Sequence, residues 1–174
     1  LAKAAIIAEV NGVEVDLVTP LADGSQVSII TSETDQGLET IRHSTAHILA
    51  QAVLELYPGA TFAIGPPIEN GFYYDFDIPD GVAIKEEELE KIEQKMRQII
   101  QADQAFVRGE TTVEQALKIF SDHPYKCEII ESADKSEVDD SETISFYQNG
   151  DGFVDLCRGP HVPSTGKVAH FKFC

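Results

Sequence analysis

The sequence predicts an α+β fold in which a mainly antiparallel sheet packs with a few helices. Two observations lead to this class. The two longest stretches with helical spacing of apolar residues lie at 35–57 and 86–101, whereas most of the short β-rich runs, joined by polar turns, follow later in the chain. Strands that follow helices, rather than alternating with them, favour antiparallel pairing. A chain of 174 residues can hold one medium domain, or one domain with a small appendage.

Residues 1–32 are expected to form a separate unit. Ala2–Ala8 has a helical composition, residues 10–17 contain a turn at Asn11-Gly12, and Val27–Thr31 is a short β-rich run. This helix, hairpin and strand are too small to close a core. We therefore expect part of one domain at 1–32 and a second domain at 35–174. The chain opens on Leu1 rather than Met, so we also expect that it was cut at its N-terminal end.

Three helices are predicted in the second unit. The first begins after the possible caps Ser32, Thr34 and Asp35 and runs to residue 56 or 57, where Pro58-Gly59 ends it. Residues 86–101 have apolar residues on one face and charged residues on the other, so they predict an amphipathic helix. Thr112, with Gln115 three places later, begins a shorter helix through a capping box.

Six short runs are predicted as strands because they are rich in β-branched and aromatic residues and end in polar or glycine-containing turns. They are Thr61–Ile64, Phe72–Phe76, Lys126–Ile130, Thr143–Tyr147, Phe153–Leu156 and Lys167–Phe173.

Composition restricts the class of protein and its partners. No apolar run approaches the roughly 20 residues that cross a bilayer, and the three cysteines form no pattern, so we expect a cytoplasmic protein without a membrane partner. The net charge of −17 argues against binding a long nucleic acid through its phosphates, because that mode needs clustered Lys and Arg. The charge still permits contact with the end of a nucleic acid.

Two pairs of reactive side chains stand about a hundred residues apart. His43 and His47 are four residues apart in a predicted helix, so both rings leave one face of it. Cys157 and His161 have the same spacing but enclose Gly159-Pro160, which indicates a turn of fixed shape. We predict that the fold brings both pairs to one pocket.

Three kinds of chemistry remain open for these residues. Zinc takes such a set of three His and one Cys tetrahedrally. Hydrolysis without a metal could use the His rings to orient a water molecule, with Asp155 as a further polar partner. Nucleophilic attack by Cys157 is the least favoured, because nothing in the sequence places this thiol at an activating helix N-terminus.

Three longer motifs resemble the editing region of bacterial-type threonyl-tRNA synthetase, a domain shared with alanyl-tRNA synthetase. They are His43-Ser44-Thr45-Ala46-His47, Ala63-Ile64-Gly65-Pro66-Pro67-Ile68-Glu69-Asn70-Gly71-Phe72-Tyr73-Tyr74-Asp75 and Asp155-Leu156-Cys157-Arg158-Gly159-Pro160-His161-Val162-Pro163. The resemblance covers nearly the whole chain. Residues 1–32 resemble the latter half of the small β-grasp (TGS) domain that precedes the editing domain.

The resemblance implies a proofreading enzyme. A threonine pocket cannot reject serine well, because one missing methyl group is worth only about 1–3 kcal/mol. The family's editing domain hydrolyses the mistaken seryl ester on the terminal adenosine of tRNA(Thr) and spares threonyl-tRNA(Thr). By the same resemblance, the catalytic set is the group His43, His47, Lys126, Asp155, Cys157 and His161.

The resemblance also suggests a role for each side chain. Water would attack the ester carbonyl, and His43 or Lys126 would handle its proton. His43, His47, Asp155 and His161 would bind the substrate. From the residues alone Lys126 would be a solvated strand lysine, so we expect Lys126→Ala to slow hydrolysis with little effect on the fold. The alanyl relatives hold zinc at the four His and Cys positions, but we expect no required cofactor, with zinc as the alternative.

The expected partners are the aminoacylated 3′ end of tRNA(Thr) and the remaining catalytic and anticodon-binding domains of a synthetase. The predicted elements use up all 174 residues, so the ligase core has no room in this chain. A module that positions the tRNA acceptor end without cleaving it is the rival from another functional class.

Overall fold

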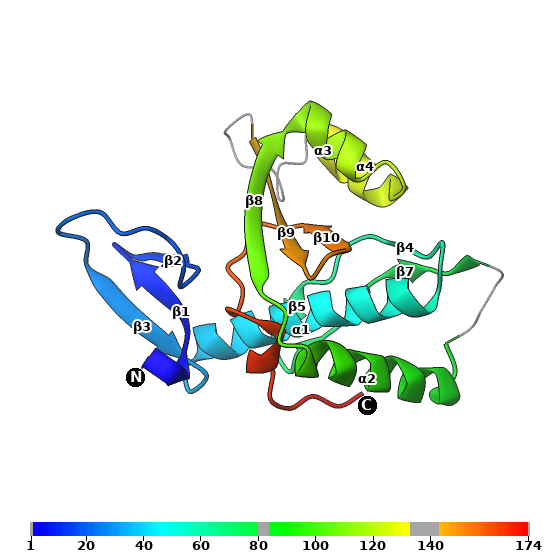
Figure 1. Ribbon diagram of the computed structural model, residues 1–174, viewed down its shortest axis with the longest axis horizontal. Coiled ribbons are helices and arrows are strands. Elements are labelled where there is room, and N and C mark those ends of the chain that lie inside the picture. The colour runs from blue at the N-terminus through cyan, green and yellow to red at the C-terminus, as the bar shows by residue number, and fades with distance from the viewer. Residues whose placement is uncertain (1, 80–83, 133–142, 174) are drawn as a thin grey trace.

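The computed structural model describes residues 2–79, 84–132 and 143–173 (Figure 1). Its described part combines helices with small antiparallel sheets, which confirms the predicted α+β class. Helix α1 (Asp35–Leu56) runs through the middle of the molecule, and the sheets lie around it.

The first unit is a three-stranded sheet that follows the short helix η1 (Ala2–Ala4). Strand β1 (Ala5–Val10) lies between β2 (Val13–Val15) and β3 (Val27–Thr31), and both pairings are antiparallel. The predicted hairpin is confirmed. Its turn has positive φ at Asn11 (52°) and Gly12 (85°), a conformation that Asn and Gly tolerate well. The predicted helix over Ala2–Ala8 is wrong beyond Ala4, because the next residues are buried and paired in β1.

Helix α1 has the predicted start and end. The Thr34 side chain accepts a hydrogen bond from the Gly37 backbone N–H at 3.1 Å, and the helix ends at Leu56, before Gly59 with φ of 88°. Residues 44–53 are all buried, so the middle of α1 lies in the core. Within the described residues, no helix is both long enough and apolar enough to cross a membrane.

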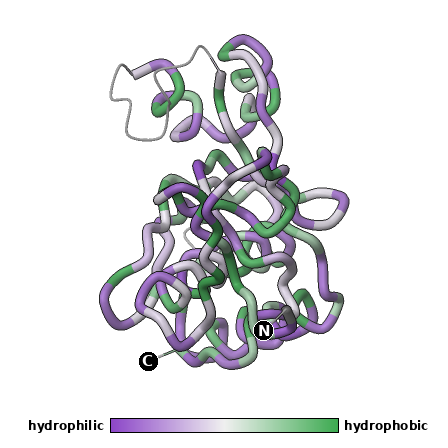
Figure 2. The backbone as a smooth tube through the Cα atoms, turned by 90° about the vertical axis from the view of Figure 1, so that its left-hand side faces the viewer, coloured by the Kyte–Doolittle hydropathy of each residue, from purple (hydrophilic) through white to green (hydrophobic). Residues whose placement is uncertain are grey.

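The amphipathic helix α2 (Glu86–Gln101) is also confirmed, and it packs along α1. Ile92, Met96 and Ile99 of α2 are buried in the main core, together with Ile48 and Val53 of α1. Figure 2 shows that the apolar segments gather in the middle of the larger, lower part of the molecule.

Two short hairpins follow α1 along the chain. Strand β4 (Thr61–Phe62) pairs with β7 (Phe76–Asp77), and β5 (Pro67–Ile68) pairs with β6 (Gly71–Phe72). The predicted strand over 61–64 is therefore shorter than expected. The single strand predicted over 72–76 is wrong, because Phe72 belongs to β6 and Phe76 to β7, with no strand between them. The segment between them carries its own hairpin and returns along α1.

A second antiparallel sheet has the order β10-β9-β8 and consists of β8 (Phe106–Thr112), β9 (Thr143–Asn149) and β10 (Phe153–Leu156). Strands β9 and β10 were predicted, and β8 was not. Gly109 interrupts the β-rich pattern of β8, but it lies opposite Phe146 of β9, whose ring would be 2.4 Å from any Cβ added there.

Helices α3 (Val113–Ile119) and α4 (Pro124–Glu131) stand at the top in Figures 1 and 2. They bury Ala116, Phe120 and Ile130 against Ile144 and Leu156 in a second small core. The predicted cap is confirmed, since Thr112 accepts a hydrogen bond from the Gln115 backbone N–H at 3.3 Å.

Two strand predictions in this half of the chain are wrong. Lys126–Ile130 belongs to helix α4, which begins at Pro124, because proline is favoured in the first turn of a helix. Lys167–Phe173 contains the end of the short helix η3 (Thr165–Lys167) followed by irregular backbone, and no strand. In this last segment Arg97 of α2 lies over the Phe171 ring at 5.0 Å.

Candidate functional site

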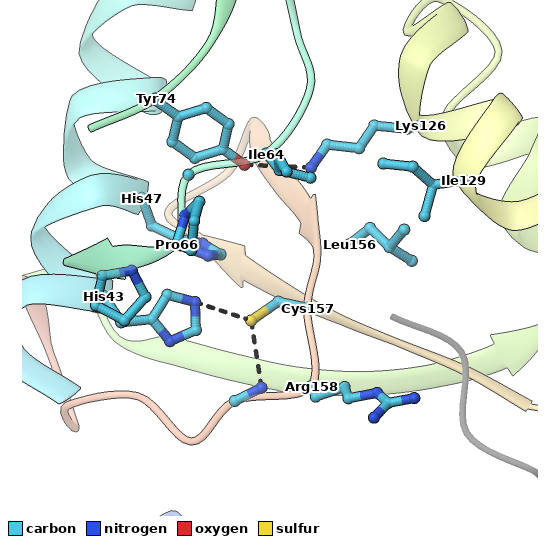
Figure 3. Close-up of a pocket in the computed structure, with 13 residues that line it drawn as sticks. His43, His47, Ile64, Pro66, Tyr74, Lys126, Ile129, Leu156, Cys157 and Arg158 are labelled. Carbon is cyan, nitrogen blue, oxygen red and sulfur yellow. Dashed lines mark hydrogen bonds between the residues drawn. The ribbon is translucent and has the colours of Figure 1, made fainter. Parts of the chain in front are cut away.

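Three histidines and one cysteine gather at the side of α1. His43 and His47 come from α1, Cys157 follows β10, and His161 follows the cis Gly159-Pro160 peptide bond. One ligand atom from each of the four residues lies within 4.8 Å of the others. Cys157 Sγ lies 3.4 Å from His43 Nε2 and 3.3 Å from His161 Nε2 (the first contact is drawn in Figure 3). The fold therefore brings the two distant pairs together.

Ser44, between the two histidines in the sequence, ties the pairs to each other. Its Oγ lies 2.9 Å from His161 Nδ1 and accepts a hydrogen bond from the Val162 backbone N–H at 3.2 Å. Ser44 is completely buried. The turn that carries His161 is thus fixed directly against α1.

Burial keeps the three histidine rings uncharged at neutral pH. Removal from water lowers the pKa of His43 to about 4, although the Asp155 carboxylate acts in the opposite direction. The same cause lowers the pKa of His47 to about 3, and burial together with the two neighbouring histidines lowers the pKa of His161. Neutral imidazoles can accept a hydrogen bond or bind a metal ion.

A buried ion pair lies beside the histidines. Lys126 Nζ is 2.6 Å from Asp155 Oδ1, and the two side chains are only 2% and 0% exposed. The Tyr74 hydroxyl donates to Asp155 Oδ2 at 2.5 Å and accepts from Lys126 Nζ at 3.1 Å (Figure 3 shows the latter bond). Burial opposes ionisation of Asp155, but the nearby Lys126 and the hydrogen bond from the Tyr74 hydroxyl outweigh it and hold the pKa of the carboxyl below its usual value.

The expected solvated strand lysine is therefore a buried helix lysine. Lys126 lies in the first turn of α4, and its Nζ lies 4.7 Å from the centre of the Phe62 ring. The expectation that Lys126 lies outside the core is wrong, because the ion pair with Asp155 holds it inside.

A pocket of about 220 Å³ opens between these groups (Figure 3). His43, His47, Lys126 and Cys157 line it, as do Tyr74 and a set of apolar and glycine-rich segments: Ile64–Pro67, Ile129, Leu156 and Gly159. Asp155 and His161 do not line it; they are buried behind residues that do.

The four His and Cys residues also meet the basic requirements of a zinc site. They offer three neutral nitrogen donors and one sulfur donor, the ligand types that zinc prefers. Ser44 holds His161 through Nδ1 and leaves Nε2 directed at the cluster, as a supporting hydrogen bond does in metal sites. His47 Nδ1 is buried and has no hydrogen-bond partner among the described residues, so its electron pair or proton is not used there.

Two residues of this site were not predicted. Tyr74 lies in an aromatic run, and such a run usually indicates packing rather than a site. Ser44 lies inside the His43–His47 motif, where the helical spacing suggests only that it occupies the same side of α1. Nothing in the local sequence indicates that either side chain bonds to residues 155–162.

Comparison with known families and proteins gives matches along the chain. Residues 144–174 match the "Threonyl and Alanyl tRNA synthetase second additional domain", and residues 1–31 match the TGS domain. The first match includes Asp155, Cys157 and His161.

Several threonine–tRNA ligases are similar to nearly the whole chain. The ligase of Citrifermentans bemidjiense is 50% identical over 176 residues, that of Rubrobacter xylanophilus 47% over 172 residues, and that of Staphylococcus epidermidis 43% over 172 residues. Each alignment covers 99% of this chain, which spans only about a quarter of the length of these curated relatives: 26%, 26% and 25%. With the TGS and second-additional-domain matches, this similarity shows that the chain belongs to the threonyl-tRNA synthetase family.

Proposed function

We propose that this chain is the proofreading module of a threonyl-tRNA synthetase, which hydrolyses seryl-tRNA(Thr) and spares threonyl-tRNA(Thr). The observation that carries the proposal is the small pocket between neutral histidines and a buried Lys126–Asp155 ion pair. A volume of about 220 Å³ is below the range of roughly 300–1,000 Å³ typical of drug-sized ligands, so it suits a small aminoacyl group.

The reaction is the addition of water to an ester. Water attacks the carbonyl carbon, the bond to the ribose oxygen breaks, and serine and tRNA with a free hydroxyl are released. His43 lines the pocket in its neutral form, and its Nε2 contacts Cys157. No hydrogen bond within the described residues occupies its Nδ1, so this atom can accept a hydrogen bond from the attacking water.

Lys126 serves better as a donor than as the base. In the ion pair it is an ammonium group, which has no lone pair to accept a proton. Of its three N–H bonds, one is directed at Asp155 and one at Tyr74. The third can donate to the ester carbonyl oxygen and stabilise the negative charge that develops there. Asp155 then acts by holding Lys126 and Tyr74, behind the pocket wall.

Selectivity follows from the walls of the pocket. Serine and threonine share an amine and a hydroxyl, so only the extra methyl group distinguishes them. Ile64, Pro66, Ile129 and Leu156 line the pocket with apolar surface of fixed shape. A wall close to the serine β-carbon would displace the threonyl ester or its water, and a displacement of about 1 Å can cost on the order of a hundredfold in rate.

A zinc-dependent hydrolase is the second candidate, favoured by the compact donor set of His43, His47, Cys157 and His161. A bound zinc ion would polarise the ester carbonyl or lower the pKa of a bound water molecule. In that case these four side chains hold the ion rather than the substrate, and Lys126 keeps its role as a donor.

The partners proposed are the aminoacylated 3′ end of tRNA(Thr) and the other domains of the parent synthetase. The net charge of −17 repels the phosphate backbone, so this chain alone should bind tRNA weakly. Because charged tRNA is the substrate, the proposed location is the cytoplasm. Cys127 and Cys157 form no disulfide within the described residues, which suits a reducing compartment.

The test is a deacylation assay at high protein concentration with seryl-tRNA(Thr) and threonyl-tRNA(Thr). We expect the seryl ester to be hydrolysed much faster, and we expect His43→Ala to slow the reaction about 10²-fold or more. His170→Ala is the matched control, because His170 is exposed and lies outside the pocket. Equal rates on both esters would contradict the proofreading role. Binding of the tRNA end without cleavage would support the non-catalytic positioning module instead.

A further inference from the structure

A carboxylate from the first unit reaches the turn that carries His161. Asp16 lies in the segment between β2 and β3. Its Oδ1 accepts a hydrogen bond from the His161 backbone N–H at 2.9 Å, and its Oδ2 accepts one from the Tyr147 hydroxyl at 2.7 Å. One side chain therefore bonds to two residues that lie far along the chain, His161 at 145 positions and Tyr147 at 131 positions from Asp16.

Tyr147 completes this link from the other side. It lies on β9, is only 1% exposed, and its ring stands edge-on to the His161 ring at 4.5 Å between centroids. Burial and the nearby Asp16 carboxylate raise the pKa of Tyr147, so the hydroxyl remains a neutral donor. Gly159 has φ of 75°, and a Cβ added there would lie 2.0 Å from the Tyr147 hydroxyl oxygen.

His161 is consequently held at both ends. Ser44 bonds its imidazole from α1, and Asp16 bonds its backbone from the first unit. Cys157, at the start of the same turn, receives a hydrogen bond at Sγ from the Gly159 backbone N–H at 3.2 Å. A change in the position of the turn would therefore move both Cys157 and His161 relative to His43.

We propose that Asp16 is a positioning residue for the candidate site, so that residues 1–32 contribute to the geometry of a site built by the second unit. This inference rests on the proposed function for its catalytic readout only. Asp16 is absent from the lining of the pocket, and the two residues to which it bonds, His161 and Tyr147, lie behind that lining. Its loss should therefore lower the rate of the chemical step and leave substrate binding nearly unchanged.

The experiment compares Asp16→Ala, Asp16→Asn and Tyr147→Phe in the 174-residue chain. Asn keeps an acceptor for the His161 N–H, whereas Ala removes both hydrogen bonds and Phe removes only the one to Tyr147. The control is Glu14→Ala, which removes the same charge two residues away. Glu14 is exposed, and its carboxylate makes no hydrogen bond within the described residues.

Two readouts are measured for each folded variant. The first is single-turnover hydrolysis of seryl-tRNA(Thr) as a function of protein concentration, which separates the rate from the half-saturation. The second is alkylation by iodoacetamide, followed by mass spectrometry of the Cys157 and Cys127 peptides. Cys157 is only 4% exposed, so loosening of the turn should raise its alkylation rate, and Cys127 on α4 serves as the internal reference.

We expect Asp16→Ala to lower the maximal rate at least about tenfold, because small displacements of reacting groups cost rate on this scale. The protein concentration at half-saturation should not change. Cys157 alkylation in this variant should rise several-fold relative to Cys127. Asp16→Asn should restore most of both properties, and Tyr147→Phe should give a smaller change in the same direction. If Asp16→Ala does not fold, the other two variants decide.

Wild-type values in Asp16→Ala, or equal losses in Glu14→Ala, would overturn the positioning role. If Asp16→Ala is unfolded, wild-type values in Tyr147→Phe would overturn it. If the wild-type chain hydrolyses no seryl ester, the proposed function fails by itself. The alkylation readout then still supports the role of Asp16 if Cys157 becomes more reactive, and overturns it if the rate is unchanged.

Discussion

Removal of the Lys126 ammonium group should destabilise the folded chain. In Lys126→Met the side chain keeps a similar length and apolar stem, but the carboxylate of Asp155 loses its ion-pair partner at 2.6 Å. Both side chains are almost completely buried, at 2% and 0% exposure. Breaking one partner of a buried pair costs about 3–5 kcal/mol, because the remaining charge is left without compensation.

The loss of stability in Lys126→Met should lie near the lower end of this range of about 3–5 kcal/mol. The Tyr74 hydroxyl still donates to Asp155 Oδ2 at 2.5 Å, and His47 Nε2 lies 3.5 Å from the same oxygen. These contacts compensate part of the charge, so we expect a loss of about 3 kcal/mol in the free energy of unfolding. That is a large share of the roughly 5–15 kcal/mol typical of a domain.

Urea unfolding followed by circular dichroism measures this loss. The double variant Lys126→Met/Asp155→Asn leaves no buried charge at this position and should recover at least about half of the stability. The matched control is Lys118→Met on α3, which changes a lysine that is 72% exposed and should shift stability by less than about 0.5 kcal/mol. A Lys126→Met variant as stable as this control would refute the buried ion pair.

Three further outcomes are expected. Stability should fall as the pH drops from 7.5 to 5, because the unfolded chain then binds a proton at His43 (usual pKa 6.5) and the folded chain, with a pKa of about 4, does not. At about 1.4 kcal/mol per pKa unit, His43 alone removes about 2 kcal/mol, and a urea midpoint that stays flat over this range would contradict its lowered pKa. Gly159→Ala should destabilise the chain by more than about 1 kcal/mol, measured by thermal unfolding. A φ of 75° is strained for alanine, and the Tyr147 hydroxyl would clash with the added methyl group. Purified protein should contain no stoichiometric zinc, and a chelator should leave hydrolysis unchanged; one zinc per chain with chelator-sensitive hydrolysis would favour the metal-dependent mechanism.

Sequence reasoning succeeded where a local pattern and the tertiary structure agree. Helices α1 and α2 have strong caps or a clear apolar face, and the Asn11-Gly12 hairpin has the preferred turn residues. Sequence reasoning failed where contact with a residue far along the chain determines the secondary structure. Strand β8 depends on the contact between Gly109 and Phe146, and β1 depends on pairing with β3 in spite of an alanine-rich composition.

The same distinction applies to the candidate site. The spacing of His43 and His47 and of Cys157 and His161 is visible in the sequence. Asp155 was suggested by its place beside Cys157, and the resemblance added Lys126. The sequence does not reveal that Lys126 is buried, because a lysine is normally solvated and only the distant Asp155 makes its burial favourable. No sequence pattern pointed to Asp16, since it lies 145 positions before the residue whose backbone N–H it accepts.

The separation of the site residues along the chain also determines when the site can form during synthesis. Cys157 lies 114 positions after His43, and His161 lies 117 positions after Ser44. At about 5–20 residues per second, roughly 6–23 seconds pass between synthesis of the two halves. Throughout that interval, Ser44 and the two histidines of α1 lack the partners that satisfy them in the folded chain. Helix α1 can therefore reach its final buried environment only after the turn at Gly159-Pro160 has left the ribosome, so that assembly of the candidate site and completion of the core coincide.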